Sequence, residues 1–127
     1  MNYVALVTLL ILLQYIIFMV QVGSARAKGG VQAPAVAGDE LFERRIRVQM
    51  NTVEQMIITL PAMWLCAYFF RWDVAAGLGL LFLIGRFIYS SAYAKDPKSR
   101  GTGFIIGFLA NIALILCGLY AVATELL

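Results

Sequence analysis

Histidine is absent from this 127-residue sequence, and cysteine, proline and charged residues are scarce. Without histidine, the chain has no imidazole to bind zinc or haem or to act as a general base. The two cysteines, Cys66 and Cys117, both lie inside apolar segments and form no CxxC motif, so we interpret them as buried apolar side chains. We therefore predict no metal site and no histidine-dependent catalysis.

The shortage of charge excludes several classes of protein. Only 13% of the residues are charged and 62% are hydrophobic, whereas soluble domains are about 25% charged and roughly 45–50% apolar. This composition excludes a soluble single-domain enzyme, a disordered segment and a nucleic-acid-binding module, despite a net charge of +3. We expect an integral membrane protein whose excess of basic residues determines its topology.

Long charge-free segments are abundant instead. Met1–Ala25 and Gly101–Thr124 contain no charged residue, and each exceeds the ~20 apolar residues that cross a bilayer as a helix. Gln55–Phe70 and Val74–Gly85 are shorter runs, which span a bilayer only if their helices extend into flanking charged turns. The sequence predicts a single all-α domain over residues 1–127, with transmembrane helices at about 2–23, 43–70, 73–94 and 102–125.

The connections predict an up-down-up-down bundle. One linker, at 24–42, is long and rich in small residues, and the other connections are short. No positive charge precedes the first apolar run, so we expect a retained helix rather than a cleaved signal peptide. Eight of the ten Lys and Arg residues lie in or beside the first and third connections. The positive-inside rule therefore predicts that these connections face the cytoplasm, and we expect a multi-pass protein of a bacterial inner membrane.

Polar side chains recur at steps of three and four residues where the second helix begins. They are Arg44, Arg47, Asn51 and Glu54. This spacing keeps side chains near one face of a helix, and the rise from the first to the last is about 15 Å. A glutamate at that depth is costly against lipid, so Glu54 should face the bundle interior, a partner subunit or a water-filled cavity.

The third predicted helix carries a second polar stripe, because Arg86, Tyr89 and Tyr93 follow at i, i+3 and i+7. We expect Arg86 to pair with Glu54, and the two stripes to form a cleft that opens toward the basic loop at 95–100. Arginine binds carboxylates in a bidentate way and amide side chains hydrogen-bond to peptide groups, so the cleft predicts a small anionic ligand. A structural polar lock between helices and, for the tyrosines, an interfacial aromatic belt are the alternatives.

The two stripes resemble a known family. The string Glu43-Arg44-x-x-Arg47-x-Gln49-x-Asn51-x-x-Glu54, followed by Arg86-x-x-Tyr89-x-x-x-Tyr93 and Arg100, is similar to the MAPEG family of membrane-associated proteins in eicosanoid and glutathione metabolism. The microsomal glutathione S-transferases of that family are the members it resembles most. The resemblance covers the whole chain, since four spans, a long first loop and both stripes occur in the same order.

The resemblance implies a homotrimer that binds glutathione, as a co-substrate, between neighbouring subunits near the cytoplasmic face. Enzymatic members conjugate glutathione to lipophilic electrophiles that arrive from the bilayer, and often reduce lipid hydroperoxides as well. Arg100 matches the arginine that activates the thiol in the transferases. The positions that match glutathione contacts are Arg47, Gln49, Asn51, Glu54, Tyr89 and Tyr93, with Arg26 as a further match and Arg86 as the cation of the predicted cleft.

Elementary chemistry supports the role of Arg100, because thiolate is the attacking species and a nearby guanidinium stabilises it. Gln55 stands where some eicosanoid-forming members carry a tyrosine that contacts glutathione, which disfavours leukotriene synthesis but not general transferase activity. Two other functions stay open. One is a non-catalytic glutathione- or lipid-binding scaffold of the same fold. The other is a small proton-coupled drug exporter, although the first helix offers only Gln14 where such a protein needs a carboxylate.

Overall fold

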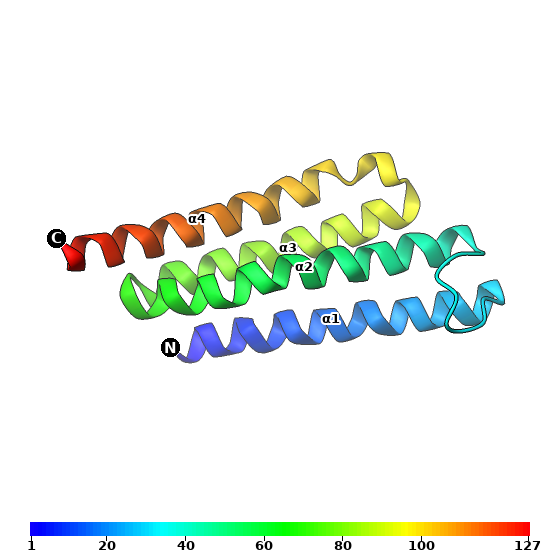
Figure 1. Ribbon diagram of the computed structural model, residues 1–127, viewed down its shortest axis with the longest axis horizontal. Coiled ribbons are helices and arrows are strands. Elements are labelled where there is room, and N and C mark those ends of the chain that lie inside the picture. The colour runs from blue at the N-terminus through cyan, green and yellow to red at the C-terminus, as the bar shows by residue number, and fades with distance from the viewer.

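The computed structural model describes all 127 residues, which form four long helices joined by short segments (Figure 1). The elements are α1 (Asn2–Gly29), α2 (Glu40–Phe69), α3 (Trp72–Lys95), the short 3-10 helix η1 (Pro97–Ser99) and α4 (Gly101–Leu126). Consecutive helices run antiparallel, and both termini lie at the same end of the bundle (Figure 1). The predicted all-α, up-down-up-down, four-helix bundle is therefore confirmed.

The two ends of the bundle differ in charge. The α1–α2 and α3–α4 connections lie together at one end, which we call the basic end because eight of the ten Lys and Arg residues lie in or beside them. The opposite end holds both termini and the tight α2–α3 turn, and we call it the terminal end (Figure 1). Its one basic side chain, Arg71, forms an ion pair with Asp73 at 2.6 Å.

α1 is six residues longer than the predicted helix, because its end is determined by a capping glycine rather than by the end of the apolar run. Gly30 adopts a left-handed conformation with φ 68°, and its N–H bonds to the carbonyl of Ala27. The N–H of Val31 bonds to the carbonyl of Arg26, which completes a Schellman cap. Val31 then packs into a small buried cluster with Phe42, which ties the long linker to the start of α2.

α2 begins three residues before the predicted start. Asp39 is its N-cap and accepts a hydrogen bond from the backbone N–H of Phe42 at 3.0 Å. Glu40 and Glu43 occupy the first turn, where negative charge favours the helix dipole. Arg44 donates to the carbonyls of Ala94 and Lys95 at 3.1 Å each, so the start of α2 is fastened to the end of α3.

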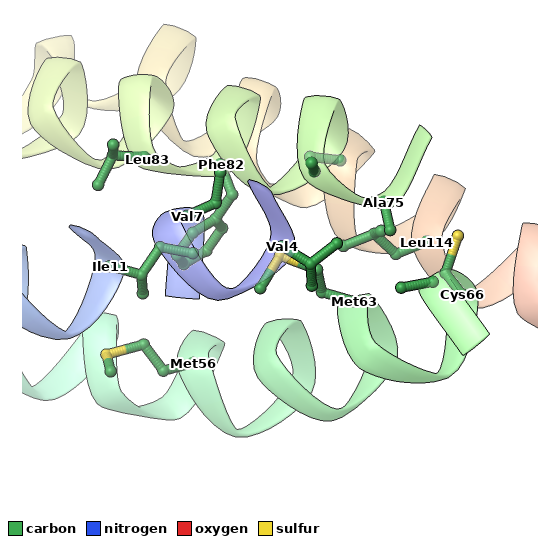
Figure 2. Close-up of a cluster of buried hydrophobic side chains, with 13 residues drawn as sticks. Val4, Val7, Ile11, Met56, Met63, Cys66, Ala75, Phe82, Leu83 and Leu114 are labelled. Atoms are coloured by element: carbon green, nitrogen blue, oxygen red, sulfur yellow. The ribbon is translucent and has the colours of Figure 1, made fainter. Parts of the chain in front are cut away.

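The main hydrophobic core lies toward the terminal end and combines all four helices. Figure 2 shows Val4, Met63, Ala75 and Leu114, one from each helix, directed toward a common centre, and all four are fully buried. On α1 the buried residues recur every three or four positions, which places them on one stripe facing the bundle. The other faces of the helices expose leucine, isoleucine and phenylalanine.

α1, α3 and the segment Pro97–Leu126 are long and apolar enough to cross a membrane. α2 does not meet that criterion, because its first half carries the polar stripe, but it packs against all three other helices. The apolar outer surface and the three candidate spans identify an integral membrane protein.

Glycines bring α3 and α4 into close contact near the basic end. A β-carbon on Gly103 would overlap the backbone of Tyr89, and one on Gly85 would lie 3.0 Å from the backbone nitrogen of Gly107. Gly103 and Gly107 lie one turn apart on α4, so they form a close-packing face toward α3. Its consequence for the site is that Tyr89 and the start of α4 are held next to each other.

Candidate functional site

A cleft lies at the basic end of the bundle, between α2, α3 and the start of α4. This cleft has a volume of about 700 Å³. Its lining residues are Arg47, Asn51, Gln55, Arg86, Tyr89, Tyr93, Lys98, Arg100, Gly101, Phe104 and Ile105. Four of these side chains are cations and none is a carboxylate, so the electrostatic potential of the cleft favours an anion.

Arg86 lies at the inner wall of the cleft and is only 1% exposed. Its Nη2 donates to the hydroxyl of Thr52 at 2.8 Å, and that hydroxyl in turn donates to the carbonyl of Val48. The guanidinium also stacks 4.0 Å from the ring centroid of Tyr89. These contacts fix the orientation of the cation without neutralising it.

The predicted pairing of Arg86 with Glu54 is wrong within this chain, because the only two ion pairs lie elsewhere, in Arg44–Glu40 and Arg71–Asp73. Glu54 is exposed on the outer face of α2. Thr52 occupies the face of α2 that meets Arg86. Glu54 lies two residues further on, about 200° around the helix, so it points away from Arg86.

Two tyrosines form the wall of the cleft on the α3 side. Asn51 donates from Nδ2 to the hydroxyl of Tyr89 at 3.0 Å, so one polar side chain of α2 is locked onto α3. The rings of Tyr89 and Tyr93 lie 5.6 Å apart, centroid to centroid. Asn51, Tyr89 and Tyr93 are thus brought together as predicted, and the side-chain oxygen of Asn51 stays available as an acceptor.

Arg100 is held at the mouth of the cleft by the short loop that precedes α4. The Asp96 side chain accepts a hydrogen bond from the backbone N–H of Lys98, and the Ser99 hydroxyl bonds to the carbonyl of Asp96. Arg100 donates from Nη1 to the carbonyl of Pro97 at 2.6 Å, and its guanidinium lies 6.0 Å from the ring centroid of Tyr93. The loop is therefore ordered by its own hydrogen bonds and presents Arg100 to the cleft.

Arg47 lies between the cleft and a second, smaller hollow of about 400 Å³. This outer hollow is lined by Gly38, Asp39, Glu40, Glu43, Arg44, Arg47, Tyr93 and Pro97. It shares Arg47 and Tyr93 with the cleft but contains three carboxylates. A cation-lined inner space thus adjoins a mixed-charge outer one.

Three predicted site residues do not reach the cleft in a single chain. Gln49 points toward α1, where its Nε2 donates to the hydroxyl of Tyr15 at 3.2 Å. Arg26 donates to the carbonyl of Ala35 at 2.8 Å and stacks over the ring of Phe42. Glu54 faces outward, as described above. The remaining predicted residues, Arg47, Asn51, Arg86, Tyr89, Tyr93 and Arg100, all line the cleft.

Three further residues contribute to the site beyond those predicted: Gln55 and Lys98 line the cleft, and Thr52 supports Arg86. Thr52 is fully buried and is the hydrogen-bond partner of Arg86. The sequence does contain a signal that Thr52 faces the bundle interior. Thr52 lies one turn after Val48, on the face of α2 opposite the charged residues. The apolar wall of Phe104 and Ile105 could not be predicted, because it depends on how closely α4 approaches α3.

The structure contains no group of three or more Cys, Asp or Glu side chains placed to hold a metal ion. The chemistry of the cleft is that of guanidinium, ammonium, amide and phenol groups. Such groups bind an anion through charge and through directed hydrogen bonds.

The fold and the cleft together define a membrane-embedded four-helix bundle with a cation-lined cleft at one end. Comparison with known proteins makes the assignment more specific: the MAPEG family profile matches residues 4–120. The chain belongs to the MAPEG family.

Three relatives illustrate the range of that similarity. An uncharacterized protein of Synechocystis is 40% identical over 122 residues, which cover 96% of this chain and 89% of the relative. Microsomal glutathione S-transferase 2 of Homo sapiens is 39% identical over 113 residues, covering 87% and 77% of the two chains. Leukotriene C4 synthase of Rattus norvegicus is 38% identical over 96 residues, covering 76% and 64%.

Proposed function

We propose that the protein is a membrane-bound glutathione S-transferase that conjugates the glutathione thiolate to lipophilic electrophiles. The observation that carries the proposal is the convergence of Arg47, Arg86 and Arg100 on one cleft without any carboxylate. Relatives that are named as a glutathione S-transferase and a leukotriene C4 synthase support it.

Glutathione suits the cleft in charge and in hydrogen-bonding groups. It carries two carboxylates and one ammonium, so it is a net anion with two peptide groups. Arg47 and Arg86 supply guanidinium donors for carboxylates, and the free oxygen of Asn51 can accept from a peptide N–H or the ammonium. The apolar side chains of Phe104 and Ile105 form the part of the wall from which a lipophilic second substrate would enter.

Arg100 stabilises the thiolate in this proposal. The thiol releases its proton to water, and the guanidinium favours the resulting anion because it stays positively charged at any working pH. The sulfur then attacks the electrophilic carbon, a C–S bond forms, and the leaving group departs with its electron pair. With a lipid hydroperoxide as acceptor, two glutathione molecules are oxidised to the disulfide while the hydroperoxide is reduced to an alcohol and water.

We further propose that three subunits assemble so that each cleft is completed by a neighbour. Glu54 and Arg47 are exposed on one face of α2 at membrane depth, and such side chains need a polar partner there. Glu54, Gln49 and Arg26 lie outside the cleft of their own chain. The excess of Lys and Arg at the basic end favours a cytoplasmic orientation of that end in a bacterial inner membrane.

Turnover by the purified protein in detergent tests the proposal. Wild-type protein should form the thioether from glutathione and an aryl halide, and Arg100→Ala should slow this reaction about 100-fold through lost anion stabilisation. Lys95→Ala is the matched control, because it removes a cation of the same end that lies outside the cleft. Equal rates for Arg100→Ala and wild type would show that Arg100 does not activate the thiol.

A binding protein without turnover is the second candidate. It is favoured by the bond from Arg100 to the carbonyl of Pro97, which occupies one end of the guanidinium. This candidate predicts saturable glutathione binding, no thiolate absorbance and no product with any electrophile or lipid hydroperoxide.

A further inference from the structure

A chain of three polar side chains connects α2 and α4 behind the cleft. The hydroxyl of Thr59 lies 2.5 Å from Oδ1 of Asn111 and 2.9 Å from the backbone carbonyl of Gln55, so its one proton is shared between these two acceptors. Nδ2 of Asn111 donates to Oε1 of Gln55 at 3.1 Å. Thr59 is fully buried and Asn111 is 3% exposed. Gln55 is half-buried and lines the cleft, so it is the only member of the chain that can reach a ligand.

The contact with Asn111 places one end of the Gln55 amide away from the cleft. Oδ1 of Asn111 lies against the hydroxyl of Thr59, and the amide nitrogen of Asn111 donates to Gln55. The oxygen of Gln55 is therefore turned toward α4. Its Nε2 donates to no protein atom and is not among the buried unpaired atoms, so its two N–H groups are free for the cleft.

Asn111 is a polar residue in an apolar helix, and without hydrogen-bond partners it would destabilise the bundle. It lies in the middle of α4, which has no charged residue between Gly101 and Thr124. An amide in such a span needs a full set of partners, and here the partners are two side chains of α2. Through this contact, α4 fixes the position of Gln55 in the cleft. The α4 residues that line the cleft themselves are Gly101, Phe104 and Ile105.

We propose that Gln55 donates hydrogen bonds from Nε2 to a carboxylate or peptide oxygen of the bound ligand, and that Asn111 and Thr59 are positioning residues that hold its amide in this orientation. The inference depends on the proposed function, because it names how glutathione is held at the inner end of the same cleft. Gln55 lies eight residues beyond Arg47, about 12 Å along the helix. That separation is suited to the two ends of an extended tripeptide.

The first test compares two changes at Thr59. Thr59→Val keeps the shape of the side chain but removes the donor, so the Asn111 amide is free to turn and glutathione affinity should fall about threefold. Thr59→Ser restores the hydroxyl and should restore the affinity. Thr124→Val is the matched control, because that hydroxyl bonds only to the carbonyl of Ala121. Equal affinity of the Val and Ser variants would overturn the positioning role.

The second test is a double-mutant cycle with Gln55→Leu and Asn111→Leu. Gln55→Leu should raise the dissociation constant for glutathione about tenfold, with a matching rise in KM and an unchanged kcat at saturation, because Gln55 does not touch the thiol. Asn111→Leu should weaken binding in the wild type but have no further effect in the Gln55→Leu background. Additive effects, or a loss of thermal stability without any loss of affinity, would contradict the proposal.

These outcomes are separable from the failure of the proposed function. If the wild-type protein does not bind glutathione in calorimetry, the function itself is wrong. If it binds and Gln55→Leu binds equally well, only the present inference is wrong. Helix content by circular dichroism identifies a variant that has not folded. If Gln55→Leu or Asn111→Leu does not fold, the comparison of Thr59→Val with Thr59→Ser tests the positioning role, because the first keeps the side-chain volume and the second keeps the hydroxyl.

Discussion

The two ends of the bundle are built for different tasks. At the terminal end, Met63, Cys66, Ala75 and Leu114 are fully buried in a core formed by all four helices. The hollow there has about 210 Å³ and six of its seven lining residues are hydrophobic. At the basic end the helices leave a cation-lined cleft of about 700 Å³. Stability and binding are therefore concentrated in different places, and mutations should separate them.

The largest expected effect is on stability at the terminal end. Met63→Ala removes a fully buried side chain of the core (Figure 2), and should lower the free energy of unfolding by about 2–5 kcal/mol. The affinity for glutathione should not change. Thermal unfolding in detergent and calorimetry measure the two quantities, and Leu65→Ala, at a 54% exposed position, is the control. A large loss of affinity in Met63→Ala would show that the ends are not independent.

Gly103→Ala should affect both properties, because it acts where α3 and α4 meet beside the cleft. Its β-carbon would overlap the backbone of Tyr89, and overpacking of this kind costs about 1–3 kcal/mol. The displaced Tyr89 should also weaken glutathione binding. Gly77→Ala is the control, since a β-carbon there meets no atom within 4 Å. If thermal unfolding and calorimetry gave wild-type values for Gly103→Ala, the close helix contact described above would be wrong.

Arg86→Met should weaken binding without lowering stability. The variant loses a buried cation that faces the cleft, so the affinity for glutathione should fall at least tenfold, or about 1.4 kcal/mol. The ligand-free protein should be no less stable, because an ion without a carboxylate partner is removed from a buried position. A loss of stability with full affinity would instead identify Arg86 as a structural lock between helices.

The smallest effect is expected at Lys98, an exposed cation at the mouth of the cleft. Lys98→Ala should weaken glutathione binding only about two- to threefold at low salt, because water screens an exposed charge. At high salt the difference from wild type should disappear. A difference that persists at high salt would mean that Lys98 makes a direct, desolvated contact with the ligand.

Most of the fold follows from the sequence because the apolar segments are long and the charges are clustered. The helix ends were less predictable. The apolar run stops well before Gly30, yet Ala25, Ala27 and Lys28 favour a helix, so α1 continues to the glycine that caps it. At α2 the N-cap Asp39 and the acidic first turn were the signals that determine the start.

The site was only partly predictable from the sequence. Helical spacing shows which residues share one face of a helix, but not which residues of another helix pack against that face. Arg86, Tyr89 and Asn51 meet as expected, since they lie on inner faces of α2 and α3. Glu54 lies outside the cleft because it is about 200° around α2 from Thr52, the residue that meets Arg86. Gln55 and Asn111 join across two helices that are adjacent only in the folded chain. No spacing within one helix contains that information.

Calorimetric titration of the purified protein with glutathione tests the central claim, that the cleft at the basic end binds this ligand. We predict saturable binding, which at about 100 times the dissociation constant stabilises the fold by about 2.7 kcal/mol and raises the unfolding temperature. Arg86→Met, with at least tenfold weaker binding, should lose about half of this stabilisation or more at the same concentration, and Met63→Ala should retain it. Absence of binding by the wild type, or equal stabilisation of wild type and Arg86→Met, would contradict the account.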